Sequence, residues 1–269
     1  MVKLVAIDLD GTLLRTDRTI SEKSRRVIRA ALREGVLVVI ATGRMFRSAQ
    51  QLVQEIADDL PIAAYNGALI KMSGSGKSLL HIPIPAEVGS SVVRFLWDFD
   101  IPFQAYYDDQ LWVRKHSESS AMYSSHYGVE VHTCPDIQWF LERDSTKYLI
   151  TEDPGRIPAI RSALEPVVGP DLRMMRSLPH MLEIVHRRAS KAHAVEFLAG
   201  FHGIDMQETM AVGDAENDLE MFESAGISVA VGNAQDQAKE RASFVVSSND
   251  EDGVVEAFER FIFWREEGS

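Results

Sequence analysis

Short apolar runs alternate with helical patterns in the first part of the chain. Residues 4–7 and 36–41 are continuous apolar runs rich in β-branched side chains, which is typical of strands covered on both faces of a sheet. Between them apolar residues recur at helical spacing, from Ser21, a suitable N-cap, to Gly35, a suitable C-terminal stop. A strand, a helix and a second strand in this order predict a parallel βαβ unit.

The alternation is interrupted in the middle of the chain and then resumes. A second helix and another strand lead to Asn66-Gly67, a two-residue hairpin signal. The following Ile-Pro-Ile-Pro run predicts an extended linker, because consecutive X-Pro units disfavour helix. We therefore predict an α/β fold with a Rossmann-like core and a central parallel sheet. The core is formed by residues 1–83 and 189–269, and an α+β domain is inserted at 84–188.

Composition agrees with a folded protein and limits its partners. The 269 residues are 45% apolar and 25% charged, and the net charge of −12 argues against binding to nucleic acid or an anionic membrane. No apolar run is long enough to cross a bilayer, and the first residues lack a signal-peptide pattern. The single cysteine excludes an internal disulfide and suits a reducing cytoplasm, where we expect the protein. Oligomeric state is not predicted.

Polar and acidic residues follow several of the predicted strands. Asp8 and Asp10 follow the first strand, residues 42–44 (Thr-Gly-Arg) follow the second, and Asp214 and Asp218 follow a later one. In open α/β sheets, ligands bind at the carboxyl ends of the strands. Carboxylates that converge there raise one another's pKa unless a cation lies among them, and Mg²⁺ is the natural candidate. Taken alone, the Asp-x-Asp pair is equally typical of a turn.

Other sequence signals for ligands fail on inspection. An EF-hand loop needs a third acidic or amide ligand at Thr12 and a glycine at Leu13. The run Gly-Ser-Gly-Lys-Ser at 74–78 ends like a P-loop, but the first glycine of that motif would fall at Lys71, so a hairpin turn is predicted instead. The histidines show no spacing typical of a zinc site.

Four short motifs carry a resemblance to a known family. They are residues 8–12 (Asp-Leu-Asp-Gly-Thr), Thr42 within Ala-Thr-Gly-Arg, Lys191, and residues 213–218 (Gly-Asp-Ala-Glu-Asn-Asp). In this order they resemble the haloacid-dehalogenase-like phosphatases, specifically the Cof-type sugar-phosphatase group, whose large cap is inserted after the third core strand. Ala192 departs from the family pattern, which usually has glycine after the lysine. The resemblance covers essentially the whole chain.

The resemblance implies a role for each acidic residue. Asp8 would be the nucleophile that forms an aspartyl-phosphate, and it would also bind the metal. Asp10 would protonate the leaving alkoxide and later take a proton from the attacking water, while its backbone carbonyl would be a metal ligand. Asp214 would complete the protein ligands of Mg²⁺, and Asp218 would orient the metal's shell.

The remaining motif residues would hold the phosphate. A hydroxyl from Thr42, a backbone N–H from Gly43 and the ammonium of Lys191 suit the equatorial oxygens of a phosphoryl group, so we assign Thr42 and Lys191 to catalysis. Taken alone, Lys191 is an exposed residue of a first helical turn, and Asn66 is a turn residue. The full set of expected substrate-binding residues is Leu9, Thr42, Gly43, Arg44, Asn66, Lys191 and Asn217.

The sequence therefore predicts a Mg²⁺-dependent phosphatase acting on a small phosphorylated metabolite, such as a sugar phosphate. A cap of this size is expected to exclude water and macromolecules and to open by hinging at its linkers. A phosphotransferase such as a hexose-phosphate mutase is the nearest alternative. A non-catalytic phospho-accepting switch, similar to receiver domains, is an alternative from another class. The cap residues that set specificity are not predicted.

Overall fold

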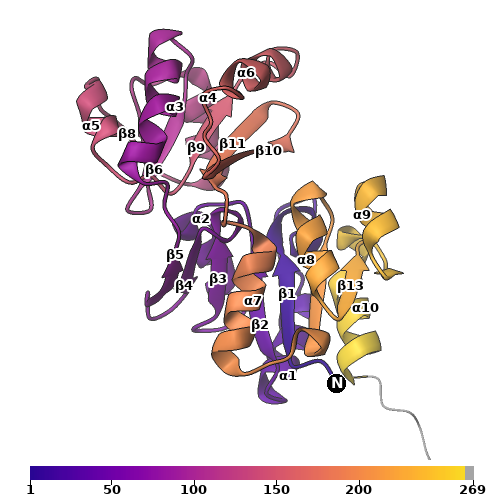
Figure 1. Ribbon diagram of the computed structural model, residues 1–269. Coiled ribbons are helices and arrows are strands. Elements are labelled where there is room, and N and C mark those ends of the chain that lie inside the picture. Colours follow the sequence, from indigo (N-terminus) through magenta and orange to yellow (C-terminus); the bar gives the residue numbers. More distant parts are fainter. Residues whose placement is uncertain (264–269) are drawn as a thin grey trace, which may run out of the picture. The chain divides into compact units, whose positions relative to one another are not determined.

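The computed structural model describes residues 1–263, and the chain divides into two units. One unit, here called the core, consists of residues 1–44 and 49–79 together with the chain from 190 onward. The other, here called the cap, consists of residues 45–48 and 80–189. In Figure 1 the colours follow the sequence, so that the cap is mostly magenta, whereas the core combines indigo with orange and yellow.

A mostly parallel sheet forms the centre of the core. Within residues 1–263 it has eight strands in the order β14-β13-β12-β1-β2-β3-β4-β5. All pairs from β14 to β3 are parallel, and β4 runs antiparallel to β3. The predicted parallel α/β sheet is thereby confirmed. The strands are β1 (Leu4–Asp8), β2 (Leu37–Ala41), β3 (Pro61–Ala64), β4 (Leu69–Met72), β5 (Ser78–His81), β12 (Thr209–Gly213), β13 (Ile227–Ala230) and β14 (Phe244–Val245).

Two segments that are distant in the sequence meet at the middle of this sheet. Strand β1 pairs with β2 on one side and with β12 on the other, and Leu4 lies opposite Thr209. Every residue of β1 and β12 is buried, as the continuous apolar runs predict. The carboxyl ends of β1, β2 and β12 therefore lie at one edge of the sheet.

Helices complete the core. Helix α1 begins after Ser21, whose side chain accepts a hydrogen bond from the Ser24 N–H, and Gly35 follows its end at φ 84°. Both predicted boundary residues are confirmed. Helix α7 packs against α8, and α1 packs against α10; Figure 1 shows α7 in front of the sheet. The helices are α1 (Glu22–Arg33), α2 (Phe46–Gln54), which belongs to the core from Ala49 onward, α7 (Lys191–His202), α8 (Leu219–Ser224), α9 (Asp236–Arg241) and α10 (Gly253–Phe258).

The connection from β3 to β4 differs from the prediction. A two-residue hairpin was expected at Asn66-Gly67, but Ala64 pairs with Leu69, so four residues form the loop. Tyr65, Asn66 and Gly67 have φ values of 53°, 55° and 88°. The physical reason is an attachment to the β2–α2 connection: the Tyr65 N–H donates to the Arg44 carbonyl at 2.8 Å, and the Asn66 N–H donates to the Thr42 carbonyl at 2.9 Å.

The cap contains a second, mostly antiparallel sheet. In its described residues six strands follow the order β10-β11-β9-β6-β7-β8, in which only β7 and β8 are parallel. Strands β6 and β7 form a hairpin joined by Asp108 and Asp109, both with positive φ. The strands are β6 (Gln104–Tyr107), β7 (Gln110–Val113), β8 (Val131–Thr133), β9 (Tyr148–Thr151), β10 (Leu172–Leu178) and β11 (Met181–His186).

Apolar side chains cover one face of the cap sheet. This face carries alternate strand residues such as Ala105, Tyr148 and Ile184, which form a hydrophobic cluster with three helices of the cap.

Helix α4 was not predicted because its serine-rich sequence has no apolar period. Ser117 caps its start, and Gly128 ends it in the left-handed conformation. The cap helices are α3 (Ala86–Asp98), α4 (Glu118–Tyr127), α5 (Ile137–Leu141) and α6 (Ile157–Leu164).

Candidate active site

Three carboxylates of the described chain lie together at the carboxyl ends of β1 and β12. Asp8 is the last residue of β1, Asp214 follows β12, and Asp218 precedes helix α8. One oxygen from each lies within 4.8 Å of the others. Neighbouring parallel strands bring these residues together, although more than two hundred positions separate Asp8 from Asp214 along the chain.

Lys191 lies inside this acidic cluster. It is the first residue of α7, which is capped by Ser190 through the His193 N–H at 3.0 Å. Its Nζ donates to Asp8 Oδ1 at 2.5 Å and to Asp218 Oδ1 at 2.7 Å, and its side chain is fully buried. The alternative of an exposed first-turn lysine is therefore wrong. Ala192 is buried, and the helix begins regularly with alanine at this position.

Hydrogen bonds hold the carboxylates of Asp218 and Asp214 in place. Asp218 Oδ2 accepts the backbone N–H groups of Asp214 at 2.9 Å and Ala215 at 3.0 Å, so both of its oxygens are engaged. The Thr12 hydroxyl donates to Asp214 Oδ1 at 3.0 Å. These bonds do not use Asp8 Oδ2 or Asp214 Oδ2. The Asp8 and Asp214 carboxylates also interact with each other.

The cluster carries an excess of negative charge. Burial raises the pKa of Asp8 well above its ordinary value; Lys191 opposes this shift, but the neighbouring carboxylates add to it. Burial and the adjacent Asp218 raise the pKa of Asp214 to about 6. Burial by itself would lower the pKa of Lys191, but Asp218 and Asp8 outweigh that effect and raise it. An all-oxygen donor set with unbalanced charge fits a hard divalent cation.

The side chain of Asp10 points to a different partner. Arg44 donates to both of its carboxylate oxygens, from Nε at 2.7 Å and from Nη2 at 2.5 Å. The Arg44 side chain is 7% exposed, whereas that of Asp10 is 48% exposed. The structure thus joins two predicted site residues in a bidentate ion pair, and the Asp10 carboxylate is not part of the acidic cluster.

The turn after β1 depends on a glycine and on a distant asparagine. Gly11 has a φ of 79°, and a Cβ built on it would lie 2.6 Å from Asp214 Oδ2, so a larger residue would clash with the cluster. Asn233 Nδ2 donates to the Gly11 carbonyl at 2.7 Å. Sequence reasoning did not select Asn233 or Thr12 as site residues. Thr12 could have been found within the first motif, and Asn233 could have been found because it follows a strand of the same sheet, β13.

The predicted phosphate-contacting residues gather at a neighbouring group of loops. Thr42 is buried, and its hydroxyl accepts the Arg44 N–H at 3.1 Å. Asn217 Nδ2 donates to Asn66 Oδ1 at 3.0 Å, and a Cβ on Gly43 would lie 3.1 Å from that same oxygen. These contacts bring together residues from three separate loops.

Two further contacts tie these loops to the rest of the site. A Cβ on Gly67, which has a φ of 88°, would lie 2.1 Å from the Ser190 carbonyl, so the loop after β3 lies against the start of α7. Leu9 is buried in the turn after β1, where its carbonyl accepts the Leu14 N–H at 2.8 Å. The site is therefore built from the first, second and fourth motifs, Lys191 and the loop after β3.

Known proteins are similar to this chain in both sequence and fold. A model of the haloacid dehalogenase-like hydrolase family matches residues 5–258. The chain is 32% identical over 256 residues to the 5-amino-6-(5-phospho-D-ribitylamino)uracil phosphatase YitU of Bacillus subtilis, covering 94% of each protein. It is 31% identical over 277 residues to YwtE, a second 5-amino-6-(5-phospho-D-ribitylamino)uracil phosphatase of Bacillus subtilis, covering 94% of this chain and 96% of YwtE.

Among solved structures, TM0651 from Thermotoga maritima is 33% identical and aligns with a TM-score of 0.87, covering 97% of this chain and 98% of that one. The chain belongs to the haloacid dehalogenase-like hydrolase family, and within it to the Cof-like phosphatases, which are phosphoric monoester hydrolases. Within residues 1–263 the helices are too short or too polar to cross a membrane.

Proposed function

We propose that this chain is a Mg²⁺-dependent phosphatase that hydrolyses a small phosphorylated metabolite through an aspartyl-phosphate on Asp8. The observation that carries the proposal is the cluster of Asp8, Asp214 and Asp218 around Lys191. A buried carboxylate beside an ammonium group is a suitable nucleophile, and the excess negative charge calls for a divalent cation.

The residues that would hold Mg²⁺ are Asp8 and Asp214, with the backbone carbonyl of Asp10. Asp218 is a positioning residue, because Lys191 and two backbone N–H groups occupy its oxygens. When bound, the cation neutralises charge on the phosphoryl oxygens and on the surrounding carboxylates. Because Mg²⁺ usually takes one or two protein carboxylates together with substrate phosphate, this donor set is sufficient.

In the first step an Asp8 oxygen attacks phosphorus, and the bond from phosphorus to the ester oxygen breaks. Lys191 orients the Asp8 carboxylate through its hydrogen bond to Oδ1 and lowers the repulsion between nucleophile and phosphate. Asp10 donates a proton to the leaving alkoxide, so that the alcohol departs neutral. Thr42, Gly43 and Asn217 lie in the loops that would hold the phosphoryl oxygens.

In the second step Asp10 acts as a base. It takes a proton from the water that attacks the aspartyl-phosphate, which releases phosphate and restores Asp8. The bidentate contact with Arg44 suits an ionised Asp10 and therefore suits this step. In the first step Asp10 must carry a proton, and we infer that the substrate phosphate draws Arg44 away from it.

Two relatives suggest a class of substrate. The names of YitU and YwtE specify a phosphorylated ribityl group, which is the phosphate ester of a sugar alcohol. This agrees with the sugar phosphates expected from the sequence, and we propose a polyhydroxylated phosphate monoester as the substrate. The single cysteine, Cys134, suits a reducing compartment, and we propose that the protein acts in the cytoplasm.

A panel of phosphate esters, scored for released phosphate, tests this function. The panel contains an aryl phosphate, several sugar and sugar-alcohol phosphates, and the phosphorylated ribityl compound. We expect turnover that requires Mg²⁺, is lost with EDTA and is abolished by Asp8→Asn. Asp17→Asn, which changes an exposed carboxylate of the core, is the matched control and is expected to keep full activity. Isomerised sugar phosphate without phosphate release, or a stable phosphoprotein without turnover, would overturn the proposal.

A further inference from the structure

Helix α2 begins without a capping side chain of its own. Its first residue is Phe46, which closely follows the loop of residues 42–44. The residue before it, Met45, is buried and apolar, and its thioether is only a weak acceptor. The first N–H groups of a helix have no partner within the helix and need an acceptor from elsewhere. The start of α2 therefore depends on another part of the chain.

Asp109 supplies this acceptor from 63 positions away in the sequence. Its Oδ1 accepts the Phe46 N–H and its Oδ2 accepts the Arg47 N–H, both at 3.0 Å. The Arg47 Nε lies 3.6 Å from Oδ2 and adds an ionic contact. The Asp109 side chain is buried, so water competes little for these bonds. A carboxylate that accepts two N–H groups at a helix start is stabilised by both the hydrogen bonds and the helix dipole.

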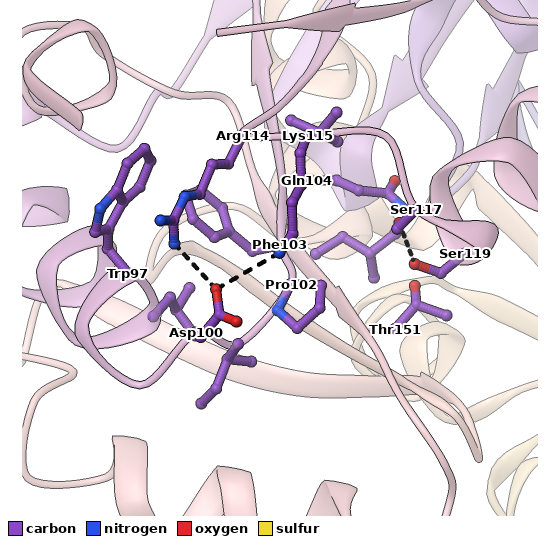
Figure 2. Close-up of a pocket in the computed structure, with 14 residues that line it drawn as sticks. Trp97, Asp100, Pro102, Phe103, Gln104, Arg114, Lys115, Ser117, Ser119 and Thr151 are labelled. Atoms are coloured by element: carbon purple, nitrogen blue, oxygen red, sulfur yellow. Dashed lines mark hydrogen bonds and ion pairs between the residues drawn. The ribbon is translucent and has the colours of Figure 1, made fainter. Parts of the chain in front are cut away.

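Asp109 lies at the tip of a hairpin that is held along its length. Strands β6 and β7 lie inside the cap sheet, where β6 also pairs with β9 and β7 also pairs with β8. Figure 2 shows the opposite end of the hairpin, with Gln104 at the start of β6 and Arg114 just after β7. There Arg114 donates to Asp100 at 3.0 Å, and its guanidinium lies 4.3 Å from the centroid of the Trp97 ring. The sheet thus fixes the place of Asp109 within the cap.

The first turn of α2 belongs to the cap by its contacts. Residues 45–48 are part of the cap, whereas residues 42–44 and the rest of α2 are part of the core. The chain therefore passes from the core to the cap directly after Arg44 and returns to the core at Ala49. The two hydrogen bonds to Asp109 tie this short passage to the cap sheet.

Arg44 connects this turn to the catalytic residues. Its side chain donates to both carboxylate oxygens of Asp10, and its N–H donates to the Thr42 hydroxyl. Only Met45 separates Arg44 from the first N–H that Asp109 holds. A shift of the first turn of α2 therefore moves the backbone from which Arg44 reaches Asp10. A displacement of about 1 Å is enough to reduce catalysis strongly.

We propose that Asp109 is a positioning residue for the phosphatase reaction, through which the cap holds Arg44 in place for Asp10. This inference rests on the function proposed above. Asp109 acts through the backbone of α2 and not on the substrate. A hinging movement of the cap must either break the two hydrogen bonds to Asp109 or displace the turn after Arg44. The cap thereby controls the Arg44–Asp10 pair in addition to covering the site.

Matched substitutions in the hairpin test this role. Asp108 and Asp109 both have positive φ, which Asn and Gly tolerate, and Asp108 is exposed. Asp109→Gly removes both acceptor oxygens without backbone strain, whereas Asp109→Asn keeps one of them. With an aryl phosphate as substrate, we expect kcat to fall about 10–100-fold in Asp109→Gly and less in Asp109→Asn. The controls Asp108→Gly and Asp108→Asn are expected to keep the wild-type kcat.

The outcomes separate this inference from the proposed function. If the wild type releases phosphate and the Asp109 variants are as active as the Asp108 controls, Asp109 has no positioning role. If the wild type releases no phosphate from any ester, the proposed function itself fails. Hydrogen exchange reports on the contact without turnover: the N–H groups of Phe46 and Arg47 are expected to exchange about tenfold faster in Asp109→Gly than in the wild type. Unchanged exchange contradicts the proposal.

A double-mutant cycle distinguishes positioning from a general effect on the fold. Arg44→Lys cannot reproduce the bidentate pair with Asp10. If Asp109 acts through Arg44, Asp109→Gly lowers kcat much less in the Arg44→Lys background than in the wild type. If the two losses in kcat simply multiply, Asp109 acts independently of Arg44 and the proposal is wrong. Circular dichroism confirms that each variant is folded at the assay temperature.

Discussion

Both units of the molecule bury charged side chains, but they balance the charges differently. In the cap, Lys147 Nζ lies 3.1 Å from Glu183 Oε2 and 5.1 Å from the centroid of the Tyr106 ring. These two charged side chains are 2% and 5% exposed. In the core, Lys191 faces the carboxylates of Asp8 and Asp218, and Asp214 adds further negative charge.

The difference separates a structural ion pair from a reactive site. The Lys147–Glu183 pair carries no net charge, so it can remain buried without a bound ion. It lies on the face of the cap sheet that points away from the hydrophobic cluster, because its strand neighbours Tyr148, Leu182 and Ile184 belong to that cluster. The core cluster keeps excess negative charge, which raises the pKa of Asp8 and prepares the site for a cation.

The largest expected effect comes from breaking the balanced pair. Lys147→Met leaves Glu183 buried without this counter-charge, and we expect the free energy of unfolding to fall by about 3–5 kcal/mol. The double variant Lys147→Met/Glu183→Leu removes both charges and is expected to recover most of that loss. Denaturant titration of the three proteins measures the effect. A single variant as stable as the wild type would show that the pair contributes little.

In the core, the corresponding change is expected to affect catalysis. Lys191→Met removes the ammonium that orients Asp8, and turnover is expected to fall about 10²–10³-fold. The variant also leaves Asp8 and Asp218 less balanced, so its stability should depend on Mg²⁺ more strongly than that of the wild type. Steady-state kinetics and thermal melts with and without Mg²⁺ measure both effects. Unchanged turnover would remove Lys191 from the catalytic machinery.

A smaller effect on stability is expected when the excess negative charge of the core cluster is reduced. Asp8→Asn removes one buried negative charge, and we expect the metal-free protein to become more stable by about 1 kcal/mol while activity is lost. Glu183→Gln in the cap is the matched comparison, and it should destabilise because it removes the buried carboxylate that lies 3.1 Å from Lys147 Nζ. Denaturant titration in EDTA measures both. Destabilisation by Asp8→Asn would mean that its pairing with Lys191 outweighs the repulsion.

The smallest effect concerns a carboxylate that is held mainly by neutral donors. The hydroxyl and backbone N–H of Ser247, at 2.7 and 2.8 Å, hold the pKa of Glu256 below its usual value. A lowered pKa in the folded state gives stability that is present above the unfolded value of 4.5 and is lost as the pH falls through the folded value. Glu256→Gln should therefore weaken the loss of stability between about pH 5 and pH 3, by at most about 1 kcal/mol.

Denaturant titrations across this pH range provide the measurement. Glu259→Gln, which changes an exposed carboxylate nearby, is the control and should follow the wild type. If Glu256→Gln and the wild type lose stability equally as the pH falls, the Ser247 contacts do not contribute to acid sensitivity.

Local patterns determined much of the fold and of the site. Apolar runs predicted β1 and β2, and Ser21 and Gly35 marked the ends of α1. Asp8, Asp214 and Asp218 could be selected from the sequence because each follows a buried strand, and parallel neighbouring strands bring such residues to one edge of a sheet. The cap was predicted less completely, since the serine-rich α4 has no apolar period and is defined by its caps.

Only the tertiary structure decided which partner each site residue contacts. Asp10 pairs with Arg44, Lys191 is buried beside Asp8 and Asp218, and Asn233 binds the Gly11 carbonyl. The four-residue loop after β3 likewise depends on its hydrogen bonds to the β2–α2 connection. The physical reason is range. A residue's neighbours along the chain set its helix or strand preference, whereas these partners lie 21 to 222 residues apart and meet only when the sheet assembles.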